Sequence, residues 1–126
     1  MEFTWLILIL LLTIHTANGV IRQEPKILCA TEDSNVTLKC EHDNADHYRL
    51  YWYKQAKDNI RLKLIVFSAG QYMVDIEAPF NTADLKYNAT RPEVKRSTLQ
   101  IKRVEAEDSA LYYCATSTQY NKQLHC

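Results

Sequence analysis

Asp108-Ser109-Ala110-Leu111-Tyr112-Tyr113-Cys114 is the stretch that decides the fold of this chain. After a polar start it runs through small, apolar and aromatic residues to a cysteine, as a strand with one buried face does. Because side chains alternate along a strand, Tyr112 and Cys114 point to the same side and Tyr113 points to the opposite side. We therefore expect Tyr112 to lie in a core and Tyr113 to lie on an outer face.

Two upstream features complete a pattern. The run Val36–Cys40 alternates in the same way and ends on a second cysteine, and Trp52 follows it along the chain. A cysteine, then a tryptophan, then a D-x-A-x-Y-x-C run resembles an immunoglobulin-type sandwich of two antiparallel sheets. The resemblance implies a disulfide between Cys40 and Cys114, with Trp52 packed on it, and a Tyr112 hydroxyl that bonds back to the backbone at a corner.

Short strands separated by turn signals are typical of an all-β sandwich. Two strands between Trp52 and Lys86 favour the nine-strand, variable-type Greek-key plan, and we expect Leu99 and Ile101 to face its core. We expect the final strand to be missing or poorly formed, because the residues after Ala115 are polar and do not alternate. The expected strands are Ile21–Ala30, Val36–Cys40, Leu50–Gln55, Leu62–Phe67, Tyr72–Ile76, Lys86–Thr90, Ser97–Lys102 and Asp108–Cys114, with Ser68–Gln71 as a turn and Arg91–Arg96 as a hairpin connection.

The 126 residues suggest one domain after a leader. The apolar run Trp5–Leu12 is too short to span a bilayer comfortably, and Ala17 and Gly19 have the spacing of a signal peptidase site. An uncleaved anchor is the alternative, because the amino-terminal region offers Glu2 rather than lysines. We expect residues 1–19 to be a signal peptide, residues 20–115 a V-type domain, and residues 116–126 the start of a hypervariable third loop or a read-through tail.

Cysteine spacing and net charge argue against a metal site, a bound cofactor and a nucleic-acid-binding surface. Secretion favours disulfides, no C-x-x-C pair occurs, and the four histidines are scattered. We expect Cys29 to be either a buried small hydrophobe or a partner of Cys126. The 15 basic and 15 acidic residues balance, which does not suggest a nucleic-acid-binding face.

The sequence also lacks the motifs of an enzyme. It contains no glycine-rich phosphate loop, nucleophile elbow or H-E-x-x-H motif. Asp43, Asp46 and His47 lie close together, but in a loop without the positioning that acid–base catalysis needs. We therefore expect a binding domain that is not an enzyme and needs no cofactor or metal.

Over Val20–Ala115 the chain resembles a T-cell receptor beta chain variable segment. The spacing of A-x-R-P and S-T-L-x-I favours a beta chain over an antibody light chain. The family usually has Pro-Gly where this chain has Lys57-Asp58-Asn59, Cys29 is extra, and the F-G-x-G strand of a joining segment is absent. The matching stretches are V-T-L-K-C at 36–40, Y-W-Y-K-Q at 51–55, L-K-L-I at 62–65, A-T-R-P at 89–92, S-T-L-Q-I at 97–101, and residues 108–115.

The absent joining segment leads to a hypothesis about the last residues. In the family, a gene-encoded variable segment stops just after its second cysteine, and recombination adds the rest. Thr116–Cys126 therefore resembles flanking sequence read through from an unrearranged segment, and Thr118-Gln119-Tyr120 is compatible with codons of a recombination heptamer. The nucleotide sequence tests this, and an in-frame joining segment after Tyr120 contradicts it.

The resemblance also implies a structural ion pair. Lys86 occupies the place of a basic residue that, in the family, pairs with the aspartate of the D-x-A-x-Y-x-C run, here Asp108. The alternative is two solvated charges that contribute almost nothing to stability. Two N-x-S/T sequons make Asn35 and Asn88 candidate N-glycosylation sites, and both side chains are then expected to be exposed.

One sheet face carries a candidate pairing surface. If Trp52 points into the core, Tyr53 and Gln55 line the opposite face, and Tyr113 shares that outward parity on another strand. Aromatic enrichment is typical of interfaces, although single exposed aromatics are common. In the family this face packs against the variable domain of an alpha chain, and Gln55 matches a position that forms a reciprocal amide pair.

Three loops are expected to cluster at one tip of the sandwich, and such loops are where recognition concentrates. They are Asp43–Tyr48, Ser68–Tyr72 and the residues after Ala115. By resemblance, their target is a peptide presented by a major histocompatibility molecule. The residues expected to contact it are Asp46, His47, Tyr48, Gln71, Tyr72, Thr116 and Ser117.

The resemblance therefore implies an antigen-recognition domain of a T-cell receptor beta chain at the extracellular face of the plasma membrane. It would pair with an alpha-chain variable domain and signal through subunits held by constant and membrane regions. A standalone V-type receptor or adhesion module and an antibody light-chain segment are the alternatives. A recombination signal downstream in the gene would indicate an antigen receptor, and a stalk with its own membrane span would indicate a free-standing receptor.

Overall fold

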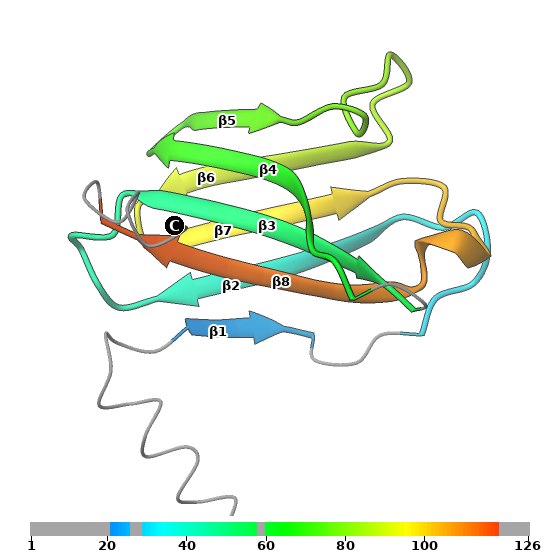
Figure 1. Ribbon diagram of the computed structural model, residues 1–126, viewed down its shortest axis with the longest axis horizontal. Helices are drawn as coiled ribbons and strands as arrows, with labels where there is room; N and C mark the ends of the chain where they lie inside the picture. The colour runs from blue at the N-terminus through cyan, green and yellow to red at the C-terminus, as the bar shows by residue number, and fades with distance from the viewer. Residues whose placement is uncertain (1–20, 26–28, 58–59, 119–126) are drawn as a thin grey trace, which may run out of the picture.

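Residues 21–25, 29–57 and 60–118 are described by a computed structural model and form two antiparallel β-sheets that face each other (Figure 1). The chain passes from one sheet to the other after its second, fifth and seventh strands, as in a Greek-key sandwich. The first sheet contains, in order, β1 (Ile21–Glu24), β2 (Val36–His42), β7 (Arg96–Ile101) and β6 (Tyr87–Glu93). The second contains β5 (Met73–Ile76), β4 (Lys63–Gly70), β3 (Arg49–Ala56) and β8 (Ala110–Ser117).

Strand β2 shows why these residues form strands with one buried face. Cys40 and His42 are buried, Val36 and Leu38 are half-buried, and the residues between them are exposed. This period of two matches the pleat of a strand, so every second side chain faces the other sheet. The alternating pattern in the sequence therefore places the core on one side of the first sheet.

The core lies between the two sheets. Trp52 and Leu99 have no exposed surface and Ile101 is 2% exposed, as expected from the sequence. Tyr112 is half-buried and packs against this cluster. Full burial of one large apolar side chain contributes about 1.5–3 kcal/mol. The buried apolar residues are Cys40, Leu50, Trp52, Ile65, Val66, Tyr87, Ala89, Leu99, Ile101, Val104 and Cys114.

A disulfide between Cys40 and Cys114 joins β2 to β8 and so connects the two sheets. Trp52 lies directly opposite Cys114 in the register of β3 and β8. Its indole N–H donates to the Ser97 hydroxyl (2.9 Å), which donates in turn to the Thr90 carbonyl (2.8 Å). The disulfide implied by the resemblance is present, and the buried indole has the hydrogen-bond partner that it needs.

The first strand is shorter than expected. It ends at Glu24 rather than at Ala30, and Pro25, which follows it, cannot donate to a strand ladder. Cys29 is a free, exposed cysteine, so the expectation that it is a buried hydrophobe is wrong. The alternative partner, Cys126, lies outside the described residues.

The β6–β7 hairpin is tighter than the expected connection over Arg91–Arg96. Strand β6 continues to Glu93 and β7 begins at Arg96, which leaves only Val94 and Lys95 between them. The pairing register shifts between Thr90 and Glu93, so the end of β6 is irregular. A proline within the strand agrees with this irregular pairing, because proline has no N–H to donate.

The β4–β5 hairpin also differs from the expectation. The segment Ser68–Gln71 was expected to be a turn, but β4 continues to Gly70, and β5 begins at Met73 rather than at Tyr72. Tyr72 has a φ of 65°, in the left-handed region that non-glycine residues adopt uncommonly. The turn is therefore confined to Gln71 and Tyr72, which are both exposed.

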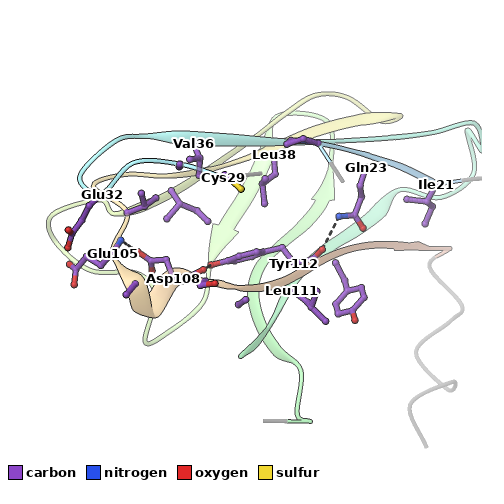
Figure 2. Close-up of a pocket in the computed structure, with 18 residues that line it drawn as sticks. Ile21, Gln23, Cys29, Glu32, Val36, Leu38, Glu105, Asp108, Leu111 and Tyr112 are labelled. Carbon is purple, nitrogen blue, oxygen red and sulfur yellow. Dashed lines mark hydrogen bonds between the residues drawn. The ribbon is translucent and has the colours of Figure 1, made fainter. Parts of the chain in front are cut away.

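Strand β8 lies at the edge of its sheet among the described residues, so the nine-strand plan is represented here by eight strands. It continues to Ser117, past the expected domain boundary at Ala115. A groove of about 890 Å³ opens beside it, and Gln23 reaches across this groove from β1 (Figure 2). The Gln23 amide donates to the Tyr112 carbonyl (2.9 Å) and accepts from the Cys114 N–H (2.8 Å). The leader predicted over residues 1–19, and any ninth strand formed by residues 119–126, fall outside the described chain.

Candidate functional site

The three side chains predicted to form a pairing face lie together on the outer face of the β5-β4-β3-β8 sheet. Tyr53 lies opposite Tyr113 in the register of β3 and β8. The Tyr113 hydroxyl donates to the Gln55 amide oxygen (3.2 Å). The ring of Tyr51 stacks on that of Tyr53, with centroids 6.0 Å apart and planes 18° apart. We call Tyr51, Tyr53, Gln55 and Tyr113 the outer aromatic face.

The Gln55 amide is partly engaged within the chain. Its nitrogen donates to the Ile60 carbonyl (3.0 Å), and its oxygen accepts from Tyr113. A glutamine amide has two N–H donors and an oxygen with two lone pairs. One donor and one lone pair therefore remain for a partner, which is what a reciprocal pair of amides requires.

Exposed apolar side chains border the outer aromatic face. Leu111 is 59% exposed and Ile60 is 91% exposed, and both line a shallow pocket that also includes Gln55. Tyr113 itself is 40% exposed. Contiguous exposed apolar area of this kind is typical of an interaction surface, because isolated hydrophobic residues are ordinary but clusters are not.

The electrostatics of this face keep it neutral. Burial raises the pKa of the Tyr53 hydroxyl, and the neighbouring Tyr51 raises it further. Tyr53 therefore carries no charge at physiological pH. Tyr53, the Gln55 amide and the apolar border therefore form a surface in which a partner has no ionised group to desolvate.

The second group of predicted site residues lies at the end of the sandwich that is on the left in Figure 1. Three connections meet there: residues 43–48 between β2 and β3, residues 71–72 between β4 and β5, and residues 94–95 between β6 and β7. We call this end the tip. The carboxyl end of β8 reaches the same place, so any third loop would start from the tip as well.

Four of the predicted contact residues are exposed at the tip. Tyr72 is 78% exposed and Tyr48 is 47% exposed. Asp46 and Gln71 are also exposed. Gln71 is held in place because its amide donates to the Pro92 carbonyl (2.9 Å). These side chains combine aromatic area with hydrogen-bonding groups, the composition that recognition loops favour.

Three other predicted contact residues are placed differently. His47 is buried, and its ring Nδ1 is 2.8 Å from the Thr116 hydroxyl. Ser117 is buried too, and its hydroxyl is 3.0 Å from that of Tyr51. Thr116 and Ser117 belong to β8, and Thr116 is half-buried. His47 and Ser117 are therefore buried and bonded within the chain, and their contact with an antigen stays a prediction.

Sequence reasoning missed the buried arginine beneath the tip. Arg91 is 1% exposed, whereas the sequence places it in the hairpin connection Arg91–Arg96. It follows Tyr87 and Ala89 in the inward phase of β6. That phase was the available signal, but an arginine followed by a proline is also typical of a turn. The two interpretations predict opposite environments for the side chain.

The predicted ion pair lies at the opposite end of the sandwich from the tip. The Lys86 ammonium is 2.8 Å from Asp108 Oδ2, which also accepts from the Glu105 N–H (2.8 Å). The other carboxylate oxygen accepts from the Tyr87 hydroxyl (3.2 Å). Asp108 ends a short 3₁₀ turn, Ala106–Asp108, and its carbonyl accepts from the Tyr112 hydroxyl (2.6 Å), as the expected corner requires. The alternative of two solvated charges does not fit this buried network.

The pKa of Asp108 reflects two opposing causes. Burial raises it, while hydrogen bonds from Lys86 and the Glu105 N–H and the charge of Lys86 lower it, and the lowering effects prevail. The carboxylate is therefore ionised at neutral pH. Burial raises the pKa of Tyr87 well above its ordinary range, and the charge of Asp108 contributes to that rise. The tyrosine stays a neutral donor to the carboxylate.

Both sequons are placed where glycans could be carried. Asn35 and Asn88 are exposed, and Asn35 uses its side-chain oxygen to accept from the Arg103 N–H (3.0 Å). That contact leaves the Asn35 amide nitrogen, which is the atom that glycosylation modifies, outside the bond. Asn88 lies on the outer side of β6, on the sheet opposite the outer aromatic face.

The described part of the chain shows no other chemical site. No group of three or more histidine, cysteine, aspartate or glutamate residues in it could hold a metal ion. None of its helices has the length and apolar character to cross a bilayer. The described residues thus present two candidate surfaces, the outer aromatic face and the tip, on a sandwich of two sheets.

Comparison with known proteins agrees with this geometry. Residues 23–125 match the family model of the immunoglobulin V-set domain. A solved structure titled "Structural basis of T cell specificity and activation by the bacterial superantigen toxic shock syndrome toxin-1" shares the fold, with a TM-score of 0.71 at 22% identity over 79% of this chain and 82% of that chain. The protein is thus an immunoglobulin variable-type domain, a class that is in general not enzymatic.

Closer relatives narrow the class. The chain is 37% identical to human "T cell receptor beta variable 7-7" over 113 residues, which cover 90% of this chain and 93% of the relative. It is 32% identical to the mouse "T-cell receptor beta chain V region LB2" over 119 residues, which cover 91% and 82% respectively. The chain belongs to the family of T-cell receptor beta variable segments.

Proposed function

We propose that this chain is the antigen-recognition domain of a T-cell receptor beta chain. It pairs with the variable domain of an alpha chain through the outer aromatic face. The tip then binds a peptide presented by a major histocompatibility molecule. The observation that carries the proposal is the arrangement of Tyr53, Gln55 and Tyr113 as one neutral, partly exposed surface, in a chain related to receptor beta segments.

The chemistry of the outer aromatic face supports pairing with a like domain. Tyrosine and aromatic residues are enriched in interfaces, and charged residues are depleted from their centres. Gln55 keeps one donor and one acceptor site free, which suits the same amide on a partner related by a two-fold axis. The exposed Leu111 and Ile60 extend the apolar area beside it.

The tip suits a partner with an uneven, polar surface. Tyr48 and Tyr72 offer exposed rings, and Asp46 and Gln71 offer polar groups beside them. A peptide held in a groove presents such a mixture of side chains. Thr116 contributes from β8 as a half-buried residue, and the rest of the third loop falls outside the described residues.

The place of action follows from the proposed function. Variable domains of these receptors are extracellular, so the chain would act at the outer face of the plasma membrane in a complex with signalling subunits. The leader at residues 1–19 and the glycans at Asn35 and Asn88 stay predictions. Amino-terminal sequencing and glycosidase digestion of the secreted chain would test both.

The pairing step is tested by a double substitution, Tyr53→Ala with Gln55→Ala, in a receptor beta chain that carries residues 20–118. We measure its surface display with an alpha chain in T cells that lack their own receptor. Display is expected to fall severalfold, because a buried aromatic and an amide pair would be lost from the centre of the interface. Thermal unfolding of the secreted domain should stay nearly unchanged.

The matched control lies on the other sheet. Lys39 of β2 and Gln100 of β7 lie on the outer side of that sheet. Lys39→Ala with Gln100→Ala removes polar surface away from the proposed interface and leaves both sequons intact, so display should be retained. Equal display of both double variants would contradict pairing through the outer aromatic face.

A further inference from the structure

We propose that Arg91 is a positioning residue for the tip, which holds three connections in one fixed arrangement from beneath. The three connections are residues 43–48, residues 71–72 and residues 94–95. The inference rests on the proposed function of the tip as a recognition surface. The ordering of several loops by one buried side chain does not depend on which ligand the tip binds.

The burial of Arg91 is unusual for a charged side chain. Only 1% of its surface is exposed, and arginine is almost never fully buried unless its donors are satisfied. Burial lowers the pKa of its guanidinium to about 10, so the group stays charged at physiological pH. A buried cation is costly, and where a site needs packing alone an apolar side chain of similar volume serves as well or better.

The guanidinium bonds two of the connections directly and bonds the strand that leads into the third. Nη1 donates to the Ser68 hydroxyl (2.8 Å), and that hydroxyl donates to the Gly70 carbonyl (3.0 Å) at the end of β4. Nη2 donates to the His47 carbonyl (3.3 Å) in the 43–48 loop. Nε and Nη2 both donate to the Val94 carbonyl (3.1 and 2.6 Å) in the β6–β7 turn. One rigid fork therefore bonds the 43–48 loop, the β6–β7 turn and the end of β4 that leads into residues 71–72.

The backbone of Arg91 adds a fourth link. Its carbonyl accepts from the Tyr72 N–H (2.7 Å), which ties the exposed Tyr72 turn directly to β6. The Val94 carbonyl is shared with the buried His42, whose Nε2 lies 2.7 Å away. The recognition residues Tyr48 and Tyr72 thus sit on connections whose positions depend on the same buried group.

Arginine is suited to this task in a way that lysine is not. Its guanidinium is planar and presents five N–H donors in a fixed geometry, whereas a lysine ammonium is a single point charge on a flexible stem. A lysine at this position offers one nitrogen in place of the three that donate to the Ser68, His47 and Val94 oxygens. The proposal therefore predicts that geometry, and not charge alone, orders the tip.

The test is amide hydrogen exchange of the full chain and of Arg91→Met, followed residue by residue. Methionine has a similar length and no donors. The reporters are the Tyr72 N–H, bonded to the Arg91 carbonyl, and the His47 N–H, bonded to the Asn44 carbonyl (3.1 Å). Relative to amides in the middle of β3 and β7, we expect exchange at both reporters to become at least about tenfold faster. In Arg91→Met, the local opening that permits exchange no longer has to break the hydrogen bonds of the guanidinium.

Lys86→Met is the matched control, since it removes a cation of the same strand region that bonds Asp108 at the far end of the sandwich. It should destabilise the whole domain and speed the tip and core amides by the same factor. Arg91→Lys separates charge from geometry, and we expect its tip reporters to exchange nearly as fast as those of Arg91→Met. Protection equal to that of the unaltered chain in Arg91→Lys would overturn the proposal.

A uniform change at tip and core in Arg91→Met would also overturn it, because Arg91 would then contribute only to global stability. If Arg91→Met fails to fold, Ser68→Ala gives the decision. That change removes one acceptor and is expected to speed exchange at Tyr72 selectively; no selective change contradicts the proposal. These measurements need no alpha chain or presented peptide, so a failure of the proposed pairing would leave their outcome unaffected.

Discussion

Single side chains hold this sandwich together through fully satisfied polar groups. Within the described chain, no buried side-chain nitrogen or oxygen lacks a hydrogen-bond partner. The pair formed by Trp52 and Ser97 is the most central case, because the indole has no exposed surface. Leaving a buried donor without a partner costs more free energy than the hydrogen bond itself contributed to stability.

Ser97→Ala is expected to lower the free energy of unfolding by about 1–3 kcal/mol, because the Trp52 indole N–H is left buried without an acceptor. Denaturant unfolding followed by tryptophan fluorescence measures the change. Ser109 is exposed, so Ser109→Ala serves as the control and should leave the midpoint unaltered. A Ser97→Ala midpoint equal to that of the control would show that the indole finds another acceptor.

At the scale of elements, strand parity in the sequence predicted the two faces of the sheets well. The inward positions of β2, β3 and β7 and the outward position of Tyr113 follow directly from alternation, because both sheets have one face in a shared core. The disulfide and the Lys86–Asp108 pair came from family resemblance, and both are present.

The misplaced residues share a physical cause. His47 and Arg91 were predicted from local composition, which reports a polar loop or turn, but the contacts that bury them come from distant strands. Arg91 meets Ser68 from β4, and His47 meets Thr116 from β8. The register shift after Trp52 in β3 was equally out of reach, since a bulge depends on how two strands pair. Contacts between distant strands cannot be predicted from the composition of one segment alone.

Strand β8 depends on a side chain from the opposite sheet. Gln23 of β1 satisfies the Tyr112 carbonyl and the Cys114 N–H along the edge of β8 that faces away from β3. Gln23→Ala is expected to cost about 1–2 kcal/mol of unfolding free energy, since two hydrogen bonds are lost. Amide exchange at Cys114 should accelerate more than exchange at the β3 edge.

Arg22→Ala, in the same strand, provides the comparison. Arg22 is exposed and lies beside Gln23 in β1, so its loss removes a similar side chain without touching β8. Thermal unfolding of the two variants distinguishes the effects. If Gln23→Ala and Arg22→Ala unfold at the same temperature, the bonds between β1 and β8 contribute nothing.

For the whole molecule, the two ends of the sandwich are expected to respond to acid in different pH ranges. At the tip, His42 is buried; burial lowers its pKa below the ordinary 6.5, and the charge of Arg91 lowers it further, although the Val94 carbonyl opposes both. His47 and Asp43 are the other titratable groups that act on it. Its Nδ1 accepts from the Asn44 N–H (3.3 Å), so the neutral ring donates through Nε2 to Val94.

The sign of each contribution follows from which state binds more protons. The unfolded chain protonates His42 at a higher pH than the folded chain does. Its contribution is therefore complete above about pH 6.5 and is lost as the pH falls through the lower folded pKa. Asp108 at the other end has a lowered pKa, so its contribution is complete above about pH 3.9 and is lost at more acid pH.

We therefore expect the unfolding free energy to decline in two steps between neutral pH and pH 2. His42→Gln, whose amide can still donate to Val94, should remove the upper step, and Asp108→Asn should remove the lower one while lowering stability at pH 7. Denaturant midpoints measured across this range test both expectations. A single step that persists in His42→Gln would mean that the tip does not titrate separately.

The bond from Tyr113 to Gln55 and the stacking of Tyr51 on Tyr53 also bear on the rate at which partners exchange. Association costs about 0.5–1.5 kcal/mol of entropy for each rotamer-rich side chain that becomes immobilised. These side chains are already held by their neighbours in the isolated domain. A docking partner therefore meets a surface with few rotamers left to freeze, and substitutions there are expected to shorten the lifetime of a complex more than they slow its formation.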